Sequence, residues 1–363
     1  MSRLPTHTLP WRGVIEEYRE FLPVSDETPV VTLLEGGTPL IESRAIGPSL
    51  PGCIRLLFKY EGVNPTGSFK DRGMTMAISK AKEEGRRITM CASTGNTSAA
   101  AAAYSTAAGM TSVVLIPAGY VALGKLSQAL AYGARTLAVE GNFDDCLAVV
   151  REITANYPVA LVNSLNPYRM EGQKTAAFEV CDALGGAPDF HALPVGNAGN
   201  ISAYWWGYKE YYEKGLIDSR PTMLGFQAAG AAPLCLGHPV AKPETVATAI
   251  RIGNPARWQD AVRAVEESGG LFRPITDEEI LATYSDLASQ EGIFVEPASA
   301  TGVAGVRKLA QEGFFGNEPV TVVCTLTGHG LKDPDRAIAL ASEPEKVPAD
   351  VERVVELLGL EKA

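Results

Sequence analysis

One lysine lies at the junction of a predicted turn and a predicted helix, in the stretch Asn64–Gly73 (NPTGSFKDRG). A proline and a glycine form the turn, and Ser68 is a candidate N-cap for a helix over 69–84. Lys70 then lies in the first helical turn, where the positive end of the helix dipole lowers the pKa of an amine and attracts anions. Such a lysine suits Schiff-base chemistry. The competing interpretation is an ordinary solvated lysine, and this stretch taken alone favours it.

A second polar stretch, Ser93–Ser98 (STGNTS), lies between an apolar run and an alanine-rich segment. At the carboxyl end of a strand and the start of a helix, these small residues would form a donor-rich site for a carboxylate. Ser93, Thr94 and Thr97 are its candidate ligands, and the Asn96 amide can bind a ring hydroxyl or an oxyanion. An ordinary turn capped by Ser or Thr is the alternative.

The third stretch reads PVGNAGNI and again joins an apolar run to a helical segment. Two glycines allow backbone N–H groups to converge on a phosphate at a helix N-terminus. The pattern is not GxGxxG, so the dinucleotide fingerprint is absent, and close packing at a tight turn is the alternative. The candidate phosphate ligands are Gly196, Asn197, Ala198, Gly199 and Asn200.

Two further stretches also follow predicted strands. The segment NSLNPYR offers Asn163, Ser164 and Arg169, and the planar guanidinium suits a second phosphate or a carboxylate. In TLTGHG, Thr327 would lie at a strand end facing a cleft. Each stretch alone is equally well explained as a turn.

Several other chemistries find no support in the sequence. The segment GYVALGKL has the spacing of a P-loop, but Leu126 replaces the Ser or Thr that binds magnesium, so Lys125 is interpreted as a helix-start residue. The four histidines are scattered and GxSxG is absent, which argues against a hydrolytic triad. The six cysteines lack the close spacing of a zinc site or a disulfide framework, so we expect no metal and buried, reduced thiols.

The predicted elements place these stretches at equivalent positions. From residue 88 onward, short apolar runs alternate with segments of helical length, which predicts βαβ units and parallel sheets. Gly109 and Gly133 suit the left-handed residue that ends a helix, and Thr276 with Glu279 predicts a capping box for a helix over 277–290. The predicted strands cover 88–92, 112–116, 135–139, 159–162, 190–195, 222–227 and 318–325.

The composition agrees with such a fold and limits the partners. With 363 residues the chain is long enough for about two domains. The formal net charge of −10 and the lack of a dense Lys/Arg stripe argue against nucleic acid or a membrane surface as a partner. The segment 1–12 does not resemble a signal peptide, and we expect a cytoplasmic protein.

Taken in order, the motifs resemble those of pyridoxal-phosphate (PLP) enzymes of the tryptophan-synthase β-subunit fold (fold type II), and most closely the threonine synthases. The resemblance runs from GTPL at Gly37 to GLKDP at Gly330 and rests on PTGSFKDRG, STGNTS, NSLNPYRMEGQKT, PVGNAGN, EPASA and TLTGHGLKDP. It implies two interleaved domains, each with a mostly parallel sheet flanked by helices. We expect a large domain over 1–65 and 158–363 and a small, mobile one over 66–157.

The resemblance also implies roles for the candidate residues. Lys70 would carry PLP covalently and act as the general base, Asn96 would contact the ring hydroxyl oxygen, residues 196–200 would hold the cofactor phosphate, and Thr327 would face the pyridine nitrogen. The loop 93–97 would bind the α-carboxylate of O-phospho-L-homoserine. Ser164 and Arg169, with Asn163 beside them, would bind the distal phosphate. The products would be L-threonine and phosphate, made by a homodimer.

Other readings remain open at this stage. A threonine or serine dehydratase of the same fold typically has a glycine-rich phosphate loop, unlike Gly-Asn-Ala-Gly-Asn here. An O-acetylserine sulfhydrylase needs no phosphate-binding arginine. A non-catalytic anion-binding protein would use the same polar turns but would not need Lys70.

Overall fold

The strand–helix alternation builds two sheets in the computed structural model, which describes residues 10–119, 123–340 and 343–360. The larger sheet has six strands, and every neighbouring pair except β1–β2 is parallel. Their spatial order is β1 (Leu40–Glu42), β2 (Ile54–Tyr60), β10 (Val320–Leu326), β7 (Phe190–Pro194), β8 (Thr222–Ala228) and β9 (Leu271–Ile275).

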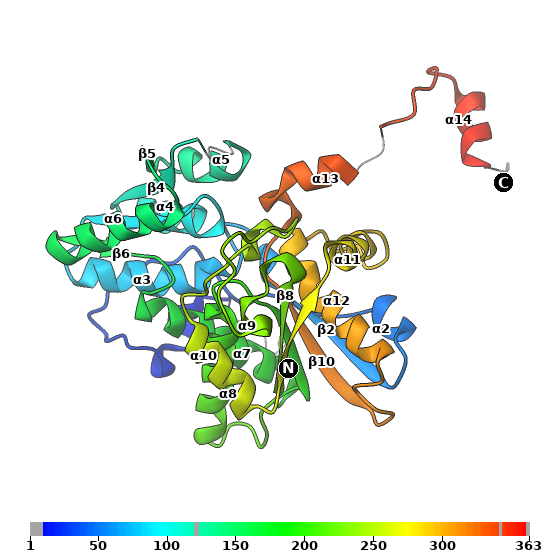
Figure 1. Ribbon diagram of the computed structural model, residues 1–363, viewed down its shortest axis with the longest axis horizontal. Coiled ribbons are helices and arrows are strands. Elements are labelled where there is room, and N and C mark those ends of the chain that lie inside the picture. Colours follow the sequence, from blue (N-terminus) through cyan, green and yellow to red (C-terminus); the bar gives the residue numbers. More distant parts are fainter. Residues whose placement is uncertain (1–9, 120–122, 341–342, 361–363) are drawn as a thin grey trace, which may run out of the picture.

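The smaller sheet is entirely parallel and lies at the other end of the molecule (Figure 1). Its order is β5 (Arg135–Val139), β4 (Thr111–Pro117), β3 (Ile88–Ala92) and β6 (Val159–Leu161). The two-sheet architecture confirms the predicted fold class. Because β6 pairs with β3, the smaller sheet extends to residue 161, just beyond the predicted small segment.

Helices cover both faces of each sheet. The described helices are α1 (Val14–Glu17), α2 (Ile46–Ser49), α3 (Lys70–Glu83), α4 (Asn96–Ala107), α5 (Leu123–Ala131), α6 (Phe143–Asn156), α7 (Pro167–Leu184), α8 (Gly199–Glu213), α9 (Pro233–Leu236), α10 (Trp258–Glu267), α11 (Asp277–Ser289), α12 (Pro297–Gln311), α13 (Pro334–Leu340) and α14 (Val351–Leu358). Helix α14 covers neither sheet: it has no buried residue and lies away from both (Figure 1). None of the described helices is long and apolar enough to cross a membrane.

Strand β10 shows how the larger sheet is buried on both sides. Val322, Cys324 and Leu326 pack into the core formed with α11 and α12, whereas Val323 points into the core formed with α7, α8 and α10. Alternate residues of one strand therefore serve two cores, as expected for a sheet covered on both faces.

Helix α3 connects the two halves of the molecule. Met74, Ile78 and Ala81 are buried together in a core with α4 and α5, while Met76 belongs to the core of the larger sheet. The residue that begins this helix, Lys70, is thereby placed between the two sheets.

Most predicted elements are confirmed, with small differences at their ends. The capping box of Thr276 and Glu279 is present, and Gly109 and Gly133 have φ of +72° and +81°. The expectation of uniformly buried thiols is wrong for Cys53, which is exposed, and for Cys235, which is partly exposed, because both lie outside the apolar cores. Residues 120–122 of the P-loop-like segment and 1–9 of the N-terminus lie outside the described residues.

Candidate active site

Lys70 is held beside the end of strand β10 by backbone contacts. The Phe69 N–H donates to the Thr327 carbonyl oxygen at 3.0 Å, and Ser68 forms an antiparallel bridge with Gly328. Ser68 Oγ also accepts a long bond of 3.4 Å from the Lys70 N–H, but the N-cap of α3 is Phe69 and no side chain caps the helix, so the predicted Ser68 cap is wrong by one residue. These backbone contacts bring Lys70 and Thr327, which are distant in the sequence, close together.

The Lys70 amine has an environment that favours its neutral form. Burial, together with the positive charge of Arg169 and against the opposing charge of Glu296, lowers the pKa of Lys70 to about 7. The amine lies 4.2 Å from the centroid of the Phe69 ring. From the sequence we expected the helix dipole to lower the pKa of Lys70, whereas in the structure the largest cause is desolvation.

The loop after β3 presents small polar residues at the start of α4. Gly95 is the N-cap and supplies no side chain, so neither Ser nor Thr caps this helix. Ser93 Oγ accepts a bond from the Gly95 N–H at 3.3 Å. Ser93, Thr94 and Thr97 are partly exposed, and the α4 N-terminus is accessible to an anion.

Asn96, the first residue of α4, contacts a residue that sequence reasoning did not select. Its Nδ2 lies 3.1 Å from both carboxylate oxygens of Glu296, the residue before α12. Glu296 was visible only as part of the EPASA motif. The signal that could have found it is a glutamate beside a proline in an otherwise apolar segment.

The loop before α8 has the geometry of an anion site. Ala198 is left-handed, with φ of +65°, which is uncommon for a residue with a side chain. Asn197 is anchored by its carbonyl oxygen, which accepts from the Arg257 N–H at 3.2 Å. Gly196 packs so closely that a Cβ would lie 3.0 Å from Ile250 Cα. Asn200 Nδ2 is buried and has no hydrogen-bond partner among the described residues.

Two glycines let α3 and α7 cross closely and bring Arg169 near Lys70. A Cβ on Gly172 would lie 1.9 Å from the Arg72 carbonyl oxygen, and one on Gly73 would lie 2.8 Å from that of Arg169. On the other side of α7, Met170 Sδ lies 3.7 Å from the position of a Gly199 Cβ. The loop 196–200 therefore lies next to the segment that contains Arg169, and Arg169 in turn lies near Lys70.

Arg169 is buried but poorly paired. Only 1% of its surface is exposed, one nitrogen donates to the Val162 carbonyl oxygen at 3.2 Å, and Nε has no partner within the described ranges. Burial lowers the pKa of the guanidinium to about 10. A buried cation with unused donors is the arrangement expected of an anion site.

Asn163 and Ser164 lie at the edge of this region. Both polar atoms of the Asn163 amide bond the backbone of Ala92, each at 3.0 Å, so Asn163 fixes the end of β3 and with it the loop 93–97. Ser164 follows and is partly exposed. Their contact with a substrate remains a prediction.

Thr327 is 4% exposed and is oriented by Ser299 of α12. The two hydroxyl oxygens lie 3.0 Å apart, and Ser299 Oγ also accepts from the Gly328 N–H at 2.9 Å. A neutral hydroxyl pair at this position can face a ring nitrogen. Sequence reasoning missed Ser299 because helix burial, not spacing, brings it here.

Behind Lys70 lies a buried ion network that was also missed. Arg72 bonds Glu61 and Glu179, and Lys59 donates to Glu179 and to the Thr38 carbonyl oxygen, both at 2.6 Å. Two cations thus face two carboxylates. The signal was a lysine in the apolar strand Ile54–Tyr60.

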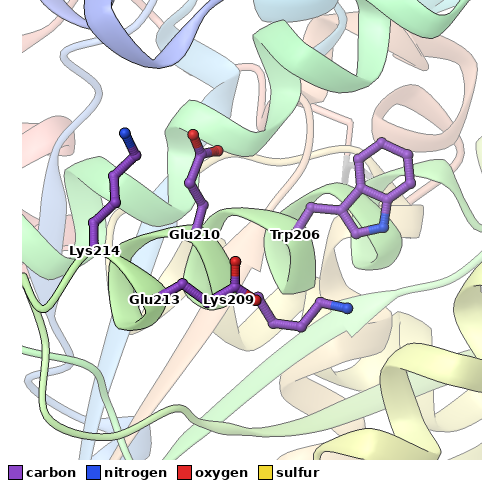
Figure 2. A pocket seen from close by; sticks show the side chains of 5 residues that line it. All are labelled: Trp206, Lys209, Glu210, Glu213 and Lys214. Carbon is purple, nitrogen blue, oxygen red and sulfur yellow. The ribbon is translucent and has the colours of Figure 1, made fainter.

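A surface depression lies elsewhere, on the outer face of α8 (Figure 2). Its volume is about 510 Å³, and charges of both signs line it. Lys209 there pairs with Glu267, and Glu210 pairs with Lys174. Two of its four charged side chains are therefore already paired with neighbours outside the depression.

Known proteins share both the sequence and the fold. The profile of the family described as pyridoxal-phosphate dependent enzyme matches residues 31–328. Threonine synthase of Synechocystis sp. is 60% identical over 351 residues, covering 96% of this chain and 91% of its own. Threonine synthase of Mycobacterium tuberculosis is 58% identical over 362 residues, covering 99% of this chain and 100% of its own.

Solved structures of more distant proteins show the same fold. Cysteine synthase from Entamoeba histolytica superposes with a TM-score of 0.74 at 19% identity, covering 100% of this chain and 99% of its own. Threonine deaminase isoform 2 from Solanum lycopersicum gives a TM-score of 0.71 at 19% identity, covering 84% of this chain and 87% of its own.

Proposed function

Because the chain belongs to the pyridoxal-phosphate dependent enzymes and, within them, to the threonine synthases, we propose that it converts O-phospho-L-homoserine and water to L-threonine and phosphate, as a carbon–oxygen lyase. One observation of the structure carries the choice of substrate. Arg169, a buried guanidinium with unused donors, lies close enough to Lys70 to lower the pKa of its amine. A substrate with a second anionic group matches this charge.

The residues of the site fit PLP. Lys70 is an amine with a pKa of about 7, and Asn200 contributes a buried N–H donor without a partner at the start of α8. The left-handed Ala198 and the tightly packed Gly196 shape the loop before that helix. Residues 196–200 would hold the cofactor phosphate, Thr327 would face the ring nitrogen, and Asn96 would face the ring hydroxyl.

When bound, PLP supplies a conjugated ring that accepts the electron pair released when a bond at the substrate Cα breaks. Lys70 would hold the cofactor, and its amine, when free, would remove protons from the substrate Cα and Cβ. A pKa of about 7 makes this amine an effective base and, once protonated, an effective acid at neutral pH. Phosphate would depart from Cγ, Cγ would take a proton back from the Lys70 ammonium, and water would add its oxygen at Cβ while a proton returns to Cα.

The remaining residues bind and orient the substrate. Ser93, Thr94 and Thr97 with the N-terminus of α4 would bind the α-carboxylate, since backbone N–H groups and hydroxyls converge there. Arg169 and Ser164 would bind the distal phosphate, with Asn163 fixing the loop from behind. Holding both ends keeps the Cα–H bond in one orientation.

The smaller sheet and its helices would close over the substrate as the segment predicted over 66–157. Gln128 of α5 makes one of the contacts across this boundary, because it donates to the Thr66 carbonyl oxygen at 3.1 Å and accepts from Lys332 of the other half. Helix α5 is therefore joined by side chains to the turn that precedes Lys70. Closure would exclude water until the addition step.

Two assays of the purified protein test the proposal. We expect a visible absorbance band that borohydride removes, leaving a pyridoxyl group on Lys70 in a peptide mass map. We also expect phosphate and L-threonine in equal amounts from O-phospho-L-homoserine. A colourless protein would refute the cofactor, and 2-oxo acid release from threonine or serine without synthase activity would favour a dehydratase.

A homodimer in the cytoplasm completes the proposal. Light scattering is expected to give twice the chain mass of 38.5 kDa, and cell fractionation should recover the protein without membranes. A monomer in scattering would contradict the assembly without affecting the chemistry.

A further inference from the structure

Glu296 is a buried carboxylate that the proposed chemistry does not yet use. It is 4% exposed and makes no ion pair within the described residues. Its side-chain hydrogen bonds come from Asn96 Nδ2, which lies 3.1 Å from each oxygen. A carboxylate buried without an ion pair is costly, so its retention calls for a reason.

Helix capping does not supply that reason. Glu296 occupies the N-cap position of α12, but its side chain makes no capping hydrogen bond. Its backbone already fixes the chain, since the Glu296 N–H donates to the Gly328 carbonyl oxygen at 3.0 Å. The carboxylate is turned instead toward Asn96.

The surroundings place this carboxylate among the residues proposed to contact the cofactor. A Cβ on Gly328 would lie 2.6 Å from Glu296 Oε1, so any side chain next to Thr327 would displace the Glu296 carboxylate. Burial raises the pKa of Glu296, while the Asn96 hydrogen bond and Lys332 lower it, Asp333 raises it and Lys70 lowers it. Its charge in turn raises the pKa of Lys70.

The geometry of the contact leaves Asn96 with one free donor. The two oxygens of a carboxylate lie too close together for both diverging N–H bonds of one amide to meet them linearly, so one N–H is shared between them. An acceptor-only carboxylate also prevents the amide from turning over, because Oδ1 would then face negative charge. The second N–H is available for a ring oxygen.

We propose that Glu296 is a positioning residue, which locks the Asn96 amide in the orientation that donates to the ring hydroxyl oxygen of the cofactor. This inference rests on the proposed function and adds a residue to its site. It predicts that Glu296 acts through Asn96, so its loss must change the electronic state of the bound cofactor as well as the rate.

The test compares E296A, E296Q and N96A with the double variant N96A/E296A as holoenzymes. We expect E296A to lower kcat by about 10-fold to 100-fold with little change in KM. We also expect it to shift the visible absorbance band of the bound cofactor. In the N96A background, E296A should have almost no further effect on either quantity.

Two variants separate positioning from folding. E296Q retains the volume and one acceptor oxygen and is expected to restore most of the band position. E291A is the matched control, since Glu291 accepts from the backbone N–H groups of Ala45 and Ile46 and should affect only Tm. If E296A does not fold, E296Q with N96A/E296Q supplies the same coupling measurement.

Clear outcomes overturn the proposal. Additive effects of N96A and E296A, or a lowered Tm with an unshifted band, would show that Glu296 only supports α12. Failure of the proposed function is distinguishable, because it would appear in the wild-type protein as a missing band or missing threonine.

Discussion

Two buried arginines lie on neighbouring helices and have opposite surroundings. Arg72 of α3 bonds Glu61, Glu179 and the Thr38 hydroxyl and is 0% exposed. Arg169 of α7 is 1% exposed and has one carbonyl partner and an unpaired Nε. The same residue type at the same depth is thus saturated in one place and underused in the other.

The difference separates structure from function. A buried charge that its neighbours neutralise contributes to the folded state, and removing one partner leaves another charge unpaired. A buried charge without a counterion lowers the stability of the folded state, and it is typically retained where a bound ligand supplies the opposite charge. The same contrast divides Lys59, which is paired with Glu179, from Lys70, which has a lowered pKa.

The largest effect is expected at Lys70. K70A should lower kcat/KM by about 10³-fold or more, because it removes the cofactor link and the base, while Tm stays near the wild-type value. K59M is the matched variant and should lower Tm, because the buried Glu179 loses one of its two cationic partners and keeps only Arg72. Equal losses of Tm in both variants would erase the distinction between the two lysines.

We expect the same difference between Arg72 and Arg169: loss of the first should lower stability, and loss of the second should impair activity. R72M is expected to cost about 3–5 kcal/mol in the free energy of unfolding. R169M should leave stability within about 1 kcal/mol and raise KM for O-phospho-L-homoserine about 30-fold or more, because a phosphate loses its charged partner. Chemical denaturation and steady-state kinetics measure both. Unchanged kinetics for R169M would remove Arg169 from the substrate site.

A smaller effect is expected where an amide lacks a partner. N200L should weaken PLP binding by about 10-fold, since a hydrogen bond to a charged group is lost, and leave apoenzyme stability equal or slightly higher. Fluorescence titration of the apoenzyme with PLP measures the first quantity and Tm the second. A destabilised apoenzyme would indicate that Asn200 already has a partner.

The smallest effect concerns pH and the saturated network. Its two cations outweigh the cost of burial and hold the pKa of Glu179 at about 2, below the ordinary 4.5. The stabilisation is complete above pH 4.5 and is lost as the pH falls toward 2. Tm should therefore fall over this range in the wild type and more gently in E179Q. Parallel curves would show that Glu179 does not set the acid limit.

Local patterns predicted the elements that carry their own signals. Strands β3 and β5 begin and end as expected, because each contains a run of at least four apolar or β-branched residues bounded by polar turns. Strand β2 was missed since it contains Lys59, and β9 since it contains Arg273 and Pro274. A charged residue in a strand is explained only when its counterion is seen.

The sequence by itself determined that polar turns follow the strands of a parallel α/β fold, and that Lys70, Asn96, residues 196–200 and Thr327 belong to one ordered set. Only the tertiary structure decided which charges are satisfied. Arg72 meets Glu179 across 107 positions, and Asn96 meets Glu296 across 200. Such pairings depend on helix crossings and burial, which short-range spacing does not encode. The structure therefore distinguishes the paired Arg72 from Arg169, the arginine with donors left for a substrate.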